Sequence, residues 1–427
     1  MANIPRKVAI IGGTRIPFCR AGSRFAKVSN VDMLTGAVSA LVQRYGLAGT
    51  RVGDAALGAV IKHSRDWNLA RETVLGSGLA PETPAYDLQR ACGTSLEGAL
   101  QIGHRIALGE IETGIAGGTD SISQAPIVHT DAFATILRTS HGAKTLGQRI
   151  APWWRLRPRD LMPVAPGVVE PRTGLSMGEH CELMAKEWRI SREDQDALAL
   201  ASHQNAAAAW DEGFYKNLVV PFAGAVRDEF VRADTSLERL AKLRPAFDKR
   251  SGTLTAGNST PLTDGASAVL LASDDWARAN GHEPQAWLAY GEVAAVDFVG
   301  KREGLLMAPA YAVPRMLARA GLALQDFDYY EIHEAFAAQV LCTLKAWESA
   351  DFCREKLGLD APLGSIDRTK LNVKGGSVAV GHPFAATGAR VLANAAALLA
   401  NKGGGRVLVS VCTGGGMGVT AIVERGI

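Results

Sequence analysis

The stretch "VGHPFAATGARVLANAAALLANKGGGRVLVSVCTGGGMG", residues 380–418, decides the fold class. It opens with a turn that contains Gly and Pro. An Ala-rich segment then predicts a helix over 389–399, and an apolar run predicts a buried strand over 407–411. A glycine cluster follows the strand directly. Strands that end in glycine and alternate with helices are typical of α/β proteins.

The same order of elements occurs earlier in the chain. "LQRACGTSLEG", residues 88–98, predicts a turn around Cys92 and then a helix over 96–108. "LGEIETGIAGGTDS" follows, with a strand near 113–115 and its own glycines. This self-similarity indicates a duplication. Two similar α/β halves around a pseudo-twofold axis would bring the turns of Cys92 and His382 face to face.

The rest of the chain is divided around these two repeats. The segment between them carries charged helical patterns and Pro-rich connectors, which favour an inserted lid over another sheet layer. The strand-like "GASAVLLAS" then returns to the first half. We expect a first half formed by 1–127 and 264–284, a loop or lid domain at 128–263, and a second half at 285–427.

Composition excludes several kinds of protein. At 427 residues and 47% hydrophobic content, the chain is long enough for two or three cores and is not of disordered type. A net charge of +3 gives no reason to expect a nucleic-acid partner. No apolar run approaches the roughly 18 residues of a membrane span, and the N-terminal run is too short for a signal peptide. Six cysteines without a CxxC pair fit reduced thiols, so we expect a cytoplasmic protein.

Two motifs pair a possible nucleophile with a possible base. Cys92 precedes a predicted helix N-terminus, whose free N–H groups lower a thiol pKa and can bind an oxyanion. A buried structural cysteine is the alternative. His382 lies between Gly381 and Pro383 at a predicted strand-to-helix turn, and this rigid backbone suits a general base. A hydrogen-bonded turn histidine is the alternative.

Two further motifs carry ionisable groups at predicted strand ends. Cys412 precedes three glycines, whose backbone N–H groups a substrate can approach closely; it is otherwise a buried cysteine. His333 and Glu334 follow "FDYYEI" and could hold a water or donate to an oxyanion, or they form a solvated helix cap. Two thiols and two imidazoles without CxxC or HExxH spacing are a poor zinc pattern, so no metal is expected. The set suits thiol acyl transfer.

In this order, the motifs resemble those of the thiolases over nearly the whole chain. The resemblance rests on "ACGTS", "LRPAF", "TLTAGNSTPLTDGASA", "GHP" and "CTGGGMG". "HEAF", where most thiolases have "NEAF", is similar to the thiolase β subunit of the fatty-acid-oxidation trifunctional complex. The resemblance implies an α/β thiolase fold, with two duplicated α/β halves packed as a layered αβαβα core and an inserted lid or loop domain.

The family implies a role for each candidate residue. Cys92 would become acylated, with His382 as its base. Cys412 would protonate the leaving acetyl-CoA enolate, or remove the α-proton in the synthetic direction. His333 would support one oxyanion hole with His382, through a water, and the backbone N–H groups of Cys92 and Gly414 would form the other.

The family also implies a CoA site. Arg232, Ser259 and Thr260 would contact CoA, and Met177 would line the pocket. CoA is then a co-substrate, with no permanently bound cofactor. The expected partners are acyl-CoA, a second copy in a dimer or dimer of dimers, and a hydratase/dehydrogenase α subunit.

The expected reaction is thiolytic cleavage of 3-ketoacyl-CoA to acetyl-CoA and a shortened acyl-CoA in fatty-acid β-oxidation. Condensation of two acetyl-CoA molecules is the alternative. A non-catalytic lipid carrier of this fold would be expected to lose Cys92, His382 or Cys412, and all three are present. Decarboxylating ketosynthases, with a Cys-His-His set, match less well.

A few positions depart from the family pattern. Ala385 stands where related proteins usually carry Gly, and it would strain the His382 loop if that position needs positive φ. Lys374 replaces a more usual Asn. Ser176 precedes Met177 where small-substrate thiolases often carry His, which leaves the acyl preference open.

The insertion contains two adjacent tryptophans. Trp153 and Trp154 lie among arginines within 149–159 and could anchor at a lipid headgroup layer or cover a bound acyl chain. A lid that packs against its own domain or against a partner subunit is the simpler interpretation.

Overall fold

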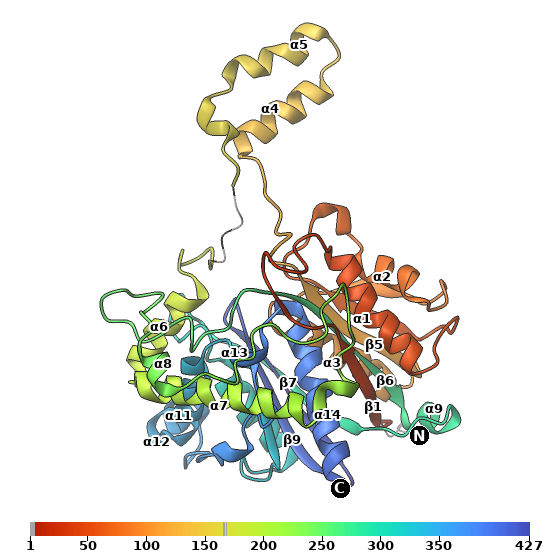
Figure 1. The fold of residues 1–427 in the computed structure, drawn as a ribbon, viewed down its shortest axis with the longest axis vertical. Coiled ribbons are helices and arrows are strands. Elements are labelled where there is room, and N and C mark those ends of the chain that lie inside the picture. The colour runs from red at the N-terminus through yellow and green to blue at the C-terminus, as the bar shows by residue number, and fades with distance from the viewer. Residues whose placement is uncertain (1–4, 165–166, 168) are drawn as a thin grey trace.

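The computed structural model describes residues 5–164, 167 and 169–427. Residues 1–4 of the expected first half, and 165, 166 and 168 of the expected insertion, lie outside the described residues. The described chain builds one mixed ten-stranded sheet with helices on its faces (Figure 1). No described helix is both long enough and apolar enough to cross a membrane.

The first half of the sheet has the strand order β4-β3-β5-β6-β1. Its strands are β1 (Val8–Arg15), β3 (Asp54–Gly58), β4 (Ala85–Asp87), β5 (Thr113–Asp120) and β6 (Thr263–Ser273), and the short β2 (Cys19–Arg20) pairs with β6. The first strand, β1, pairs antiparallel with the last, β6, which pairs antiparallel with the one before it, β5. β5 then pairs in parallel with β3.

The second half repeats this pairing in the order β7-β10-β9-β8. Its strands are β7 (Ala286–Ala295), β8 (Tyr329–Ile332), β9 (Gly405–Thr413) and β10 (Met417–Arg425). The first strand again pairs antiparallel with the last, the last with the one before it, and β9 pairs in parallel with β8. The predicted duplication is therefore confirmed in the strand topology. The halves join where β1 meets β7.

Side chains along the strands alternate between two cores, which produces the layers. Val407, Val409 and Val411 of β9 pack into a central core with α3 (Thr94–Ala107) and α14 (Thr387–Lys402). Leu408, between them in the sequence, faces the opposite side. There the outer helices are α10 (Ala308–Ala320) and α11 (Ala337–Glu348), and α1 (Asn30–Arg44) and α2 (Leu69–Ser77) cover the outer face of the first half. The order of layers is αβαβα.

The two central helices meet at their N-termini, which positions the site. Glycine is required at Gly388 of α14, because a Cβ there would lie 2.3 Å from the backbone nitrogen of Leu96 in α3. The backbone N–H of Ala389 donates to Ser95 Oγ over 2.7 Å. α3 begins at Thr94 and α14 at Thr387, each two residues before its predicted range.

The segment between β5 and β6 contains helices and irregular connections. Its helices are α4 (Asp131–Gly142), α5 (Leu146–Ile150), α6 (Met177–Glu187), α7 (Arg192–Asp211) and α8 (Leu237–Ala241). The remaining helices are α9 (Asp274–Ala279), α12 (Ala350–Leu357) and α13 (Ser377–Val380). α7 coincides with the charged helix expected near 190–213.

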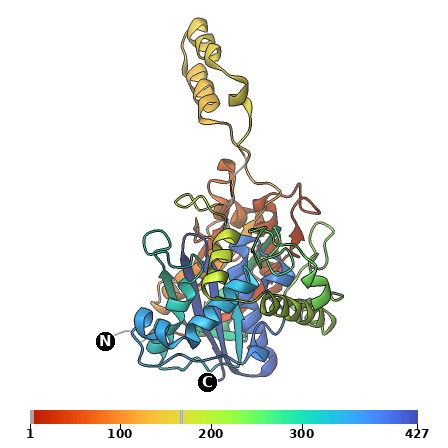
Figure 2. The same cartoon turned by 90° about the vertical axis from the view of Figure 1, so that its left-hand side faces the viewer.

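Residues 128–164, here called the hairpin, stand away from the body of the molecule (Figures 1 and 2). The hairpin is held together by its own contacts. Trp153 Nε1 donates to Ser140 Oγ over 3.0 Å, and Thr130 Oγ1 donates to the carbonyl of Asp160 over 2.7 Å. The expectation of a lid packed on its own domain is therefore not met for the described residues of the hairpin, because it closes on itself rather than on the sheet.

Candidate active site

Cys92 and His382 come from opposite halves of the duplication and meet between α3 and α14. The distance from His382 Nε2 to Cys92 Sγ is 3.1 Å, within the range of a hydrogen bond to sulfur. The turn of Cys92 precedes α3 as expected. The turn of His382 follows the short helix α13 and not the predicted strand. The N–H groups of Val380 and Gly381 donate to the carbonyls of Gly376 and Ser377, which makes this segment helical.

The turn before Cys92 stores backbone strain. Ala91 has φ of +42°, a left-handed conformation that is unfavourable for a residue with a Cβ and costs on the order of 1–3 kcal/mol. Thr94 stabilises this turn, since its Oγ1 donates to the carbonyl of Ala91 over 2.7 Å and accepts from the N–H of Arg90 over 2.9 Å. The strained turn presents the sulfur to His382 from the start of α3.

Both members of this pair are neutral at rest. Burial raises the pKa of the Cys92 thiol to about 12, although the backbone N–H groups of Gly414 and Cys92 itself lower it in part. Burial, with the nearby Arg390 cation, lowers the pKa of His382 to about 3. The helix N-terminus was expected to lower the pKa of this thiol; backbone N–H groups do lower it, but desolvation outweighs them. Formation of a thiolate at Cys92 therefore requires a proton acceptor such as His382.

This resting state predicts an unusual alkylation profile. With a thiol pKa near 12, the thiolate fraction of Cys92 should rise about tenfold per pH unit throughout the neutral range. The rate of Cys92 alkylation by iodoacetamide, followed by peptide mass spectrometry from pH 6 to 9, should rise without a plateau. A plateau with a midpoint near pH 7 would show an activated thiolate instead.

Ala385 does not strain the backbone of the loop that carries His382. Ala385 lies in a 3-10 turn and is not among the residues with positive φ. Its N–H donates to Asp120 Oδ2 over 2.8 Å, and that carboxyl also accepts the N–H groups of Val60 and Ile61. Burial raises the pKa of Asp120 to about 7. The loop is thus fixed to the end of β5, and alanine fits there.

Lys374 and Ser176, the other two positions that differ from the family pattern, lie outside the pair of Cys92 and His382. The Lys374 ammonium forms an ion pair of 2.5 Å with Glu212 on the surface. Ser176 is the N-cap of α6 and accepts from the N–H of Glu179 in a capping box, so its hydroxyl is used in starting the helix.

His333 lies directly beside His382, with ring centroids 4.1 Å apart. Its Nδ1 is 2.7 Å from Ser377 Oγ, which accepts from the Arg390 guanidinium over 2.8 Å. Arginine only donates, so Ser377 Oγ accepts from Arg390 with one lone pair. We assign the Ser377 proton to a hydrogen bond with His333 Nδ1, which places the imidazole proton on Nε2. Burial, His382 and Arg390 hold the pKa of His333 well below its usual value. The neutral ring therefore offers an Nε2–H donor.

That donor is unused in the described structure. His333 Nε2 is buried and has no hydrogen-bond partner among the described residues. An unpaired buried donor is costly unless a ligand completes it. The arrangement therefore suits an oxyanion between His333 and His382.

Glu334, in contrast, is part of the scaffold. Its buried carboxylate accepts hydrogen bonds from Ser202 Oγ, Asn372 Nδ2 and the N–H of Val378. The pair of His333 and Glu334 is therefore not a solvated helix cap. Glu334 fixes the segment that presents Ser377.

Cys412 and Gly414, at the end of β9, lie beside Cys92. Burial, followed by the neighbouring Cys92, raises the pKa of Cys412 well above its ordinary value, so it is a thiol at rest. The Gly414 N–H acts on the Cys92 thiol and lowers its pKa in part. Glu170 Oε1 accepts from the Gly415 N–H over 2.6 Å and holds this loop. Met177 packs in the same apolar cluster as Cys412.

A cleft of about 460 Å³ contains the three residues expected to contact CoA. Arg232, Ser259 and Thr260 line it, together with Arg20 and with Arg239, which is ion-paired with the lining carboxylate of Asp234. Ser259 Oγ is buried and without a partner among the described residues. Met177 does not line this cleft and lies beside the Gly414 loop instead. The cleft has the positive charge that an anionic phosphate ligand requires.

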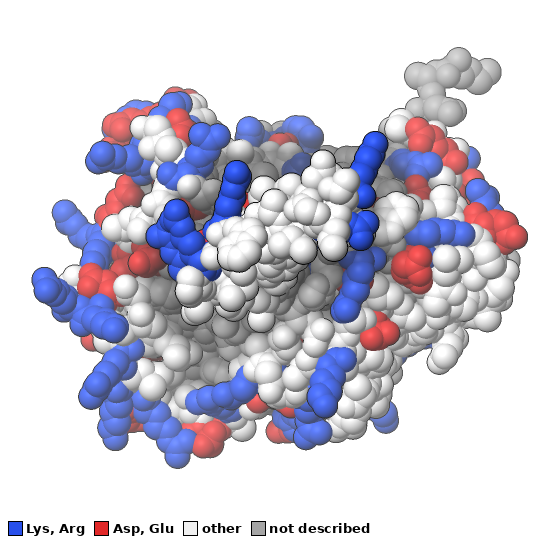
Figure 3. All heavy atoms as spheres, turned by 90° about the horizontal axis from the view of Figure 1, so that it is seen from above, with Lys and Arg blue, Asp and Glu red and all other residues white. Residues whose placement is uncertain are grey.

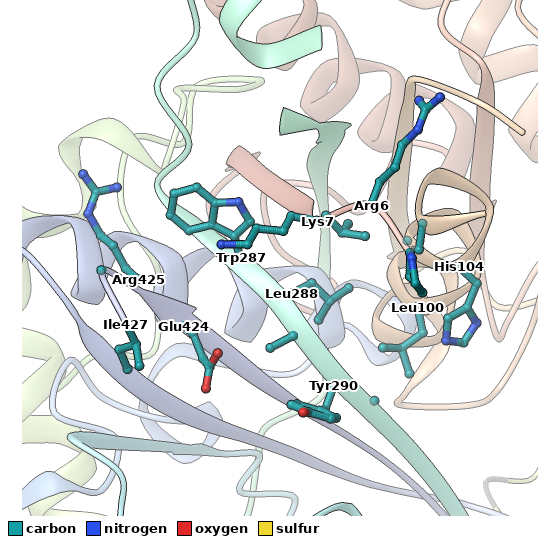
Figure 4. Close-up of a pocket in the computed structure, with 17 residues that line it drawn as sticks. Arg6, Lys7, Leu100, His104, Trp287, Leu288, Tyr290, Glu424, Arg425 and Ile427 are labelled. Carbon is teal, nitrogen blue, oxygen red and sulfur yellow. The ribbon is translucent and has the colours of Figure 1, made fainter. Parts of the chain in front are cut away.

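A second cavity of about 460 Å³ lies far from these residues, where β1 and β7 pair over only two positions (Figure 4). Trp287 lines it. Two arginines of the cavity are already ion-paired, Arg6 with Glu112 and Arg425 with Glu283. None of the expected site residues lines it, so it takes no part in the site.

Sequence reasoning missed the groups that orient the two histidines. Ser377 and Arg390 act on His333, and Thr387 Oγ1 lies 2.5 Å from His382 Nδ1. Thr387 lies in the quoted stretch 380–418 and Ser377 lies three residues before it, but their hydroxyls carry no pattern of their own. Only the packing of α13 against His333 reveals the role of Ser377.

Comparison with known proteins identifies relatives over the full chain. Residues 8–275 match the thiolase N-terminal domain family and residues 286–425 match the thiolase C-terminal domain family. The 3-ketoacyl-CoA thiolase of Yersinia enterocolitica is 44% identical over 98% of this chain and 97% of the relative. The corresponding protein of Yersinia pestis is 43% identical, with the same coverage.

Solved structures agree in fold. Human mitochondrial 3-ketoacyl-CoA thiolase in complex with CoA superposes with a TM-score of 0.81 at 30% identity, covering 99% of each chain. The acetyl-CoA acetyltransferase of Bacillus anthracis superposes with a TM-score of 0.82 at 29% identity, covering 99% of this chain and 100% of the other. These two proteins are named for different reactions, so the fold alone does not separate the two directions.

Proposed function

Because this chain belongs to the thiolase family and is an acyltransferase, we propose that it cleaves 3-ketoacyl-CoA with CoA through an acyl-enzyme on Cys92. The observation that carries the proposal is the 3.1 Å contact between Cys92 Sγ and His382 Nε2, with the free donor of His333 beside it. The products are acetyl-CoA and a chain-shortened acyl-CoA. The 3-ketoacyl-CoA thiolases at 43–44% identity favour this direction over condensation of two acetyl-CoA molecules.

The first half-reaction transfers the acyl group to sulfur. His382 Nε2 takes the Cys92 proton while the sulfur attacks the 3-keto carbon, and the backbone N–H groups of Cys92 and Gly414 stabilise the resulting oxyanion. The bond between C2 and C3 then breaks, and its electron pair forms the acetyl-CoA enolate. The enolate oxygen lies against His333 and His382, and Cys412 delivers a proton to C2.

The second half-reaction restores the enzyme. The thiol of free CoA attacks the acyl-Cys92 thioester, and the Cys92 sulfur leaves. The proton from CoA and the one held by His382 return to Cys92 and Cys412. Atoms and charges balance over the cycle, and no metal or bound cofactor is required.

Thiolysis rates on 3-ketoacyl-CoA substrates from C4 to C16 test this function. Cleavage that depends on Cys92 and extends to long chains supports the β-oxidation reaction. A strict preference for acetoacetyl-CoA would favour the condensing alternative. Retained thiolysis in Cys92→Ala would overturn the mechanism.

Removal of His333 should affect turnover more than binding. Since the loss of one oxyanion donor typically costs about 10²–10³ in rate, we expect His333→Ala to lower kcat by that factor with KM little changed. Ser377→Ala leaves the His333 ring in place but removes the hydroxyl that keeps its proton on Nε2. The fall in kcat should therefore be smaller, about tenfold. An unchanged kcat in His333→Ala would remove this residue from the oxyanion hole.

We propose that CoA lies in the cleft of Arg232, Ser259 and Thr260. Its negative phosphates complement the arginines, and Ser259 offers an unpaired hydroxyl. Val378 lines the cleft and directly follows Ser377, the partner of His333, so the cleft leads toward the catalytic histidines. Arg232→Ala should raise the KM for CoA with little change in kcat.

We further propose a cytoplasmic homodimer or dimer of dimers that associates with a hydratase/dehydrogenase α subunit. The support is the similarity of "HEAF" to the β subunit of the trifunctional complex, and six cysteines that are all unpaired. Analytical ultracentrifugation of the purified chain measures the oligomer directly. Co-purification of the candidate α subunit with the tagged chain, compared with an unrelated tagged protein as the control, tests the complex.

The hairpin is proposed to contact an anionic membrane surface. Trp154 is 87% exposed, and the hairpin exposes further large apolar side chains: Leu146, Ile150, Leu161 and Met162. Seen from above, an uncharged strip is flanked by Lys and Arg side chains (Figure 3). Aromatic residues with basic neighbours suit a negatively charged headgroup layer.

Liposome co-sedimentation tests this membrane proposal. Wild type and the control Trp67→Ala, which removes an exposed tryptophan outside the hairpin, should bind vesicles containing anionic lipid. The Trp153→Ala/Trp154→Ala variant should remain in the supernatant. Equal partitioning of all three proteins would end the membrane interpretation and leave a partner subunit as the occupant.

A further inference from the structure

Three soft or borderline metal ligands converge at the catalytic centre. Cys92, His333 and His382 each offer one ligand atom, and these three atoms all lie within 4.8 Å of one another. In tetrahedral zinc sites, bonds of about 2.0–2.3 Å place neighbouring ligand atoms about 3.3–3.7 Å apart. Small side-chain shifts therefore suffice to close these three atoms around one ion. The chain spacing gave no sign of this set, because the fold alone brings the residues together.

The surroundings of the two imidazoles are those of metal-binding histidines. Metal-bound histidines usually have the second ring nitrogen held by a hydrogen bond, which orients the ring. Here Ser377 Oγ lies 2.7 Å from His333 Nδ1 and Thr387 Oγ1 lies 2.5 Å from His382 Nδ1. His382 Nε2 is thereby directed toward Cys92. The His333 Nε2 is buried and has no partner among the described residues, so it is available to a ligand.

We propose that Cys92, His333 and His382 form an inhibitory site for a soft divalent cation, with Zn²⁺ as the preferred ion. Binding displaces the Cys92 thiol proton to solvent. The His333 proton moves from Nε2 to Nδ1, where it donates to Ser377 Oγ. The fourth ligand position stays open to water or to the thiol of CoA.

Charge limits the strength of the site. Two neutral imidazoles and one thiolate leave the bound ion with a net charge of +1. The buried Arg390 guanidinium, which contacts Ser377, opposes that charge. We therefore expect binding weaker than in structural zinc sites, and reversal by a chelator. Since binding releases a proton, affinity should rise with pH across the neutral range.

The functional consequence rests on the proposed function. A bound ion occupies the nucleophile, its base and the oxyanion donor together, so it should abolish acyl transfer. His333 is the residue that makes the site tridentate. With asparagine at that position, as in most thiolases, only Cys92 and His382 remain.

Metal binding by the full chain without substrate tests the proposal independently of thiolysis. Zn²⁺ is titrated against a chromophoric chelator, and Co²⁺ is titrated while recording the visible bands of tetrahedral cobalt and the near-ultraviolet thiolate charge-transfer band. The test variants are His333→Asn and Cys92→Ala, and the control is His104→Asn, an exposed histidine outside the site. Circular dichroism establishes that each variant is folded.

Wild type and His104→Asn should bind one equivalent, and both test variants should bind at least about tenfold more weakly. The thiolate band should be absent in Cys92→Ala. Wild-type affinity in His333→Asn, or a missing thiolate band in wild type, would overturn the site. If wild type binds one equivalent but shows no thiolysis, the proposed function fails while the metal site stands. If zinc binds without inhibiting active enzyme, the site lies elsewhere.

Discussion

Replacing Cys92 by alanine is expected to lower kcat for 3-ketoacyl-CoA thiolysis by about 10⁴-fold or more, because the acyl group then has no atom to which it can be transferred. The side chain is small and its sulfur contacts His382 at the edge of the central core, so the fold should persist. Steady-state thiolysis and circular dichroism on the same preparation measure the two effects separately.

A matched control separates chemistry from the loss of a cysteine. Cys353 of the outer helix α12 is fully buried and does not line the cleft of Arg232. Cys353→Ala should keep kcat within about twofold of wild type, at a modest cost in stability. Comparable losses in both variants would mean that Cys92 acts through packing, and the nucleophile assignment would fail.

The second large effect is expected at Cys412. Proton transfer by a positioned side chain typically contributes 10²–10⁴-fold, so Cys412→Ala should lower kcat for thiolysis by about 10³-fold. The acyl-enzyme, however, should still form from a simple acyl-CoA. That exchange of one thioester for another requires only Cys92 and His382, which remain 3.1 Å apart.

The different effects expected on acylation and on C–C cleavage distinguish proton transfer by Cys412 from a structural role. Acylation by a saturated acyl-CoA and cleavage of the 3-ketoacyl-CoA are measured side by side on Cys412→Ala. Loss of the cleavage alone supports proton transfer to C2 of the enolate. Equal loss of both would indicate that Cys412 supports the geometry of Cys92, which is its neighbour in the buried site.

The duplicated core could be predicted from the sequence because the pattern that defines it is local. Strand, helix and glycine cluster recur in a fixed order around Cys92 and His382, and the pairing of strands follows the same plan in both halves. Turns that occupy matching positions in two related halves must face each other across their shared axis. The meeting of Cys92 with His382 was therefore predictable.

Properties that depend on packing were not predictable. The thiol pKa of Cys92 was expected to fall at the α3 N-terminus, yet burial raises it, since desolvation depends on residues from the other half. The role of Ser377 and Arg390 on His333 required the position of α13. The hairpin was expected to pack against its own domain or a partner subunit, and nothing in its sequence indicated that it stands away from the body.

The central claim is that the acyl group is carried by Cys92. The most direct measurement incubates the enzyme with an acyl-CoA in the absence of free CoA, quenches it in acid and maps the modified peptide by mass spectrometry. We predict one acyl group per chain, on the peptide that contains Cys92, and its release on addition of CoA. Acylation of Cys412 in place of Cys92, or turnover with no acylated peptide, would contradict the account.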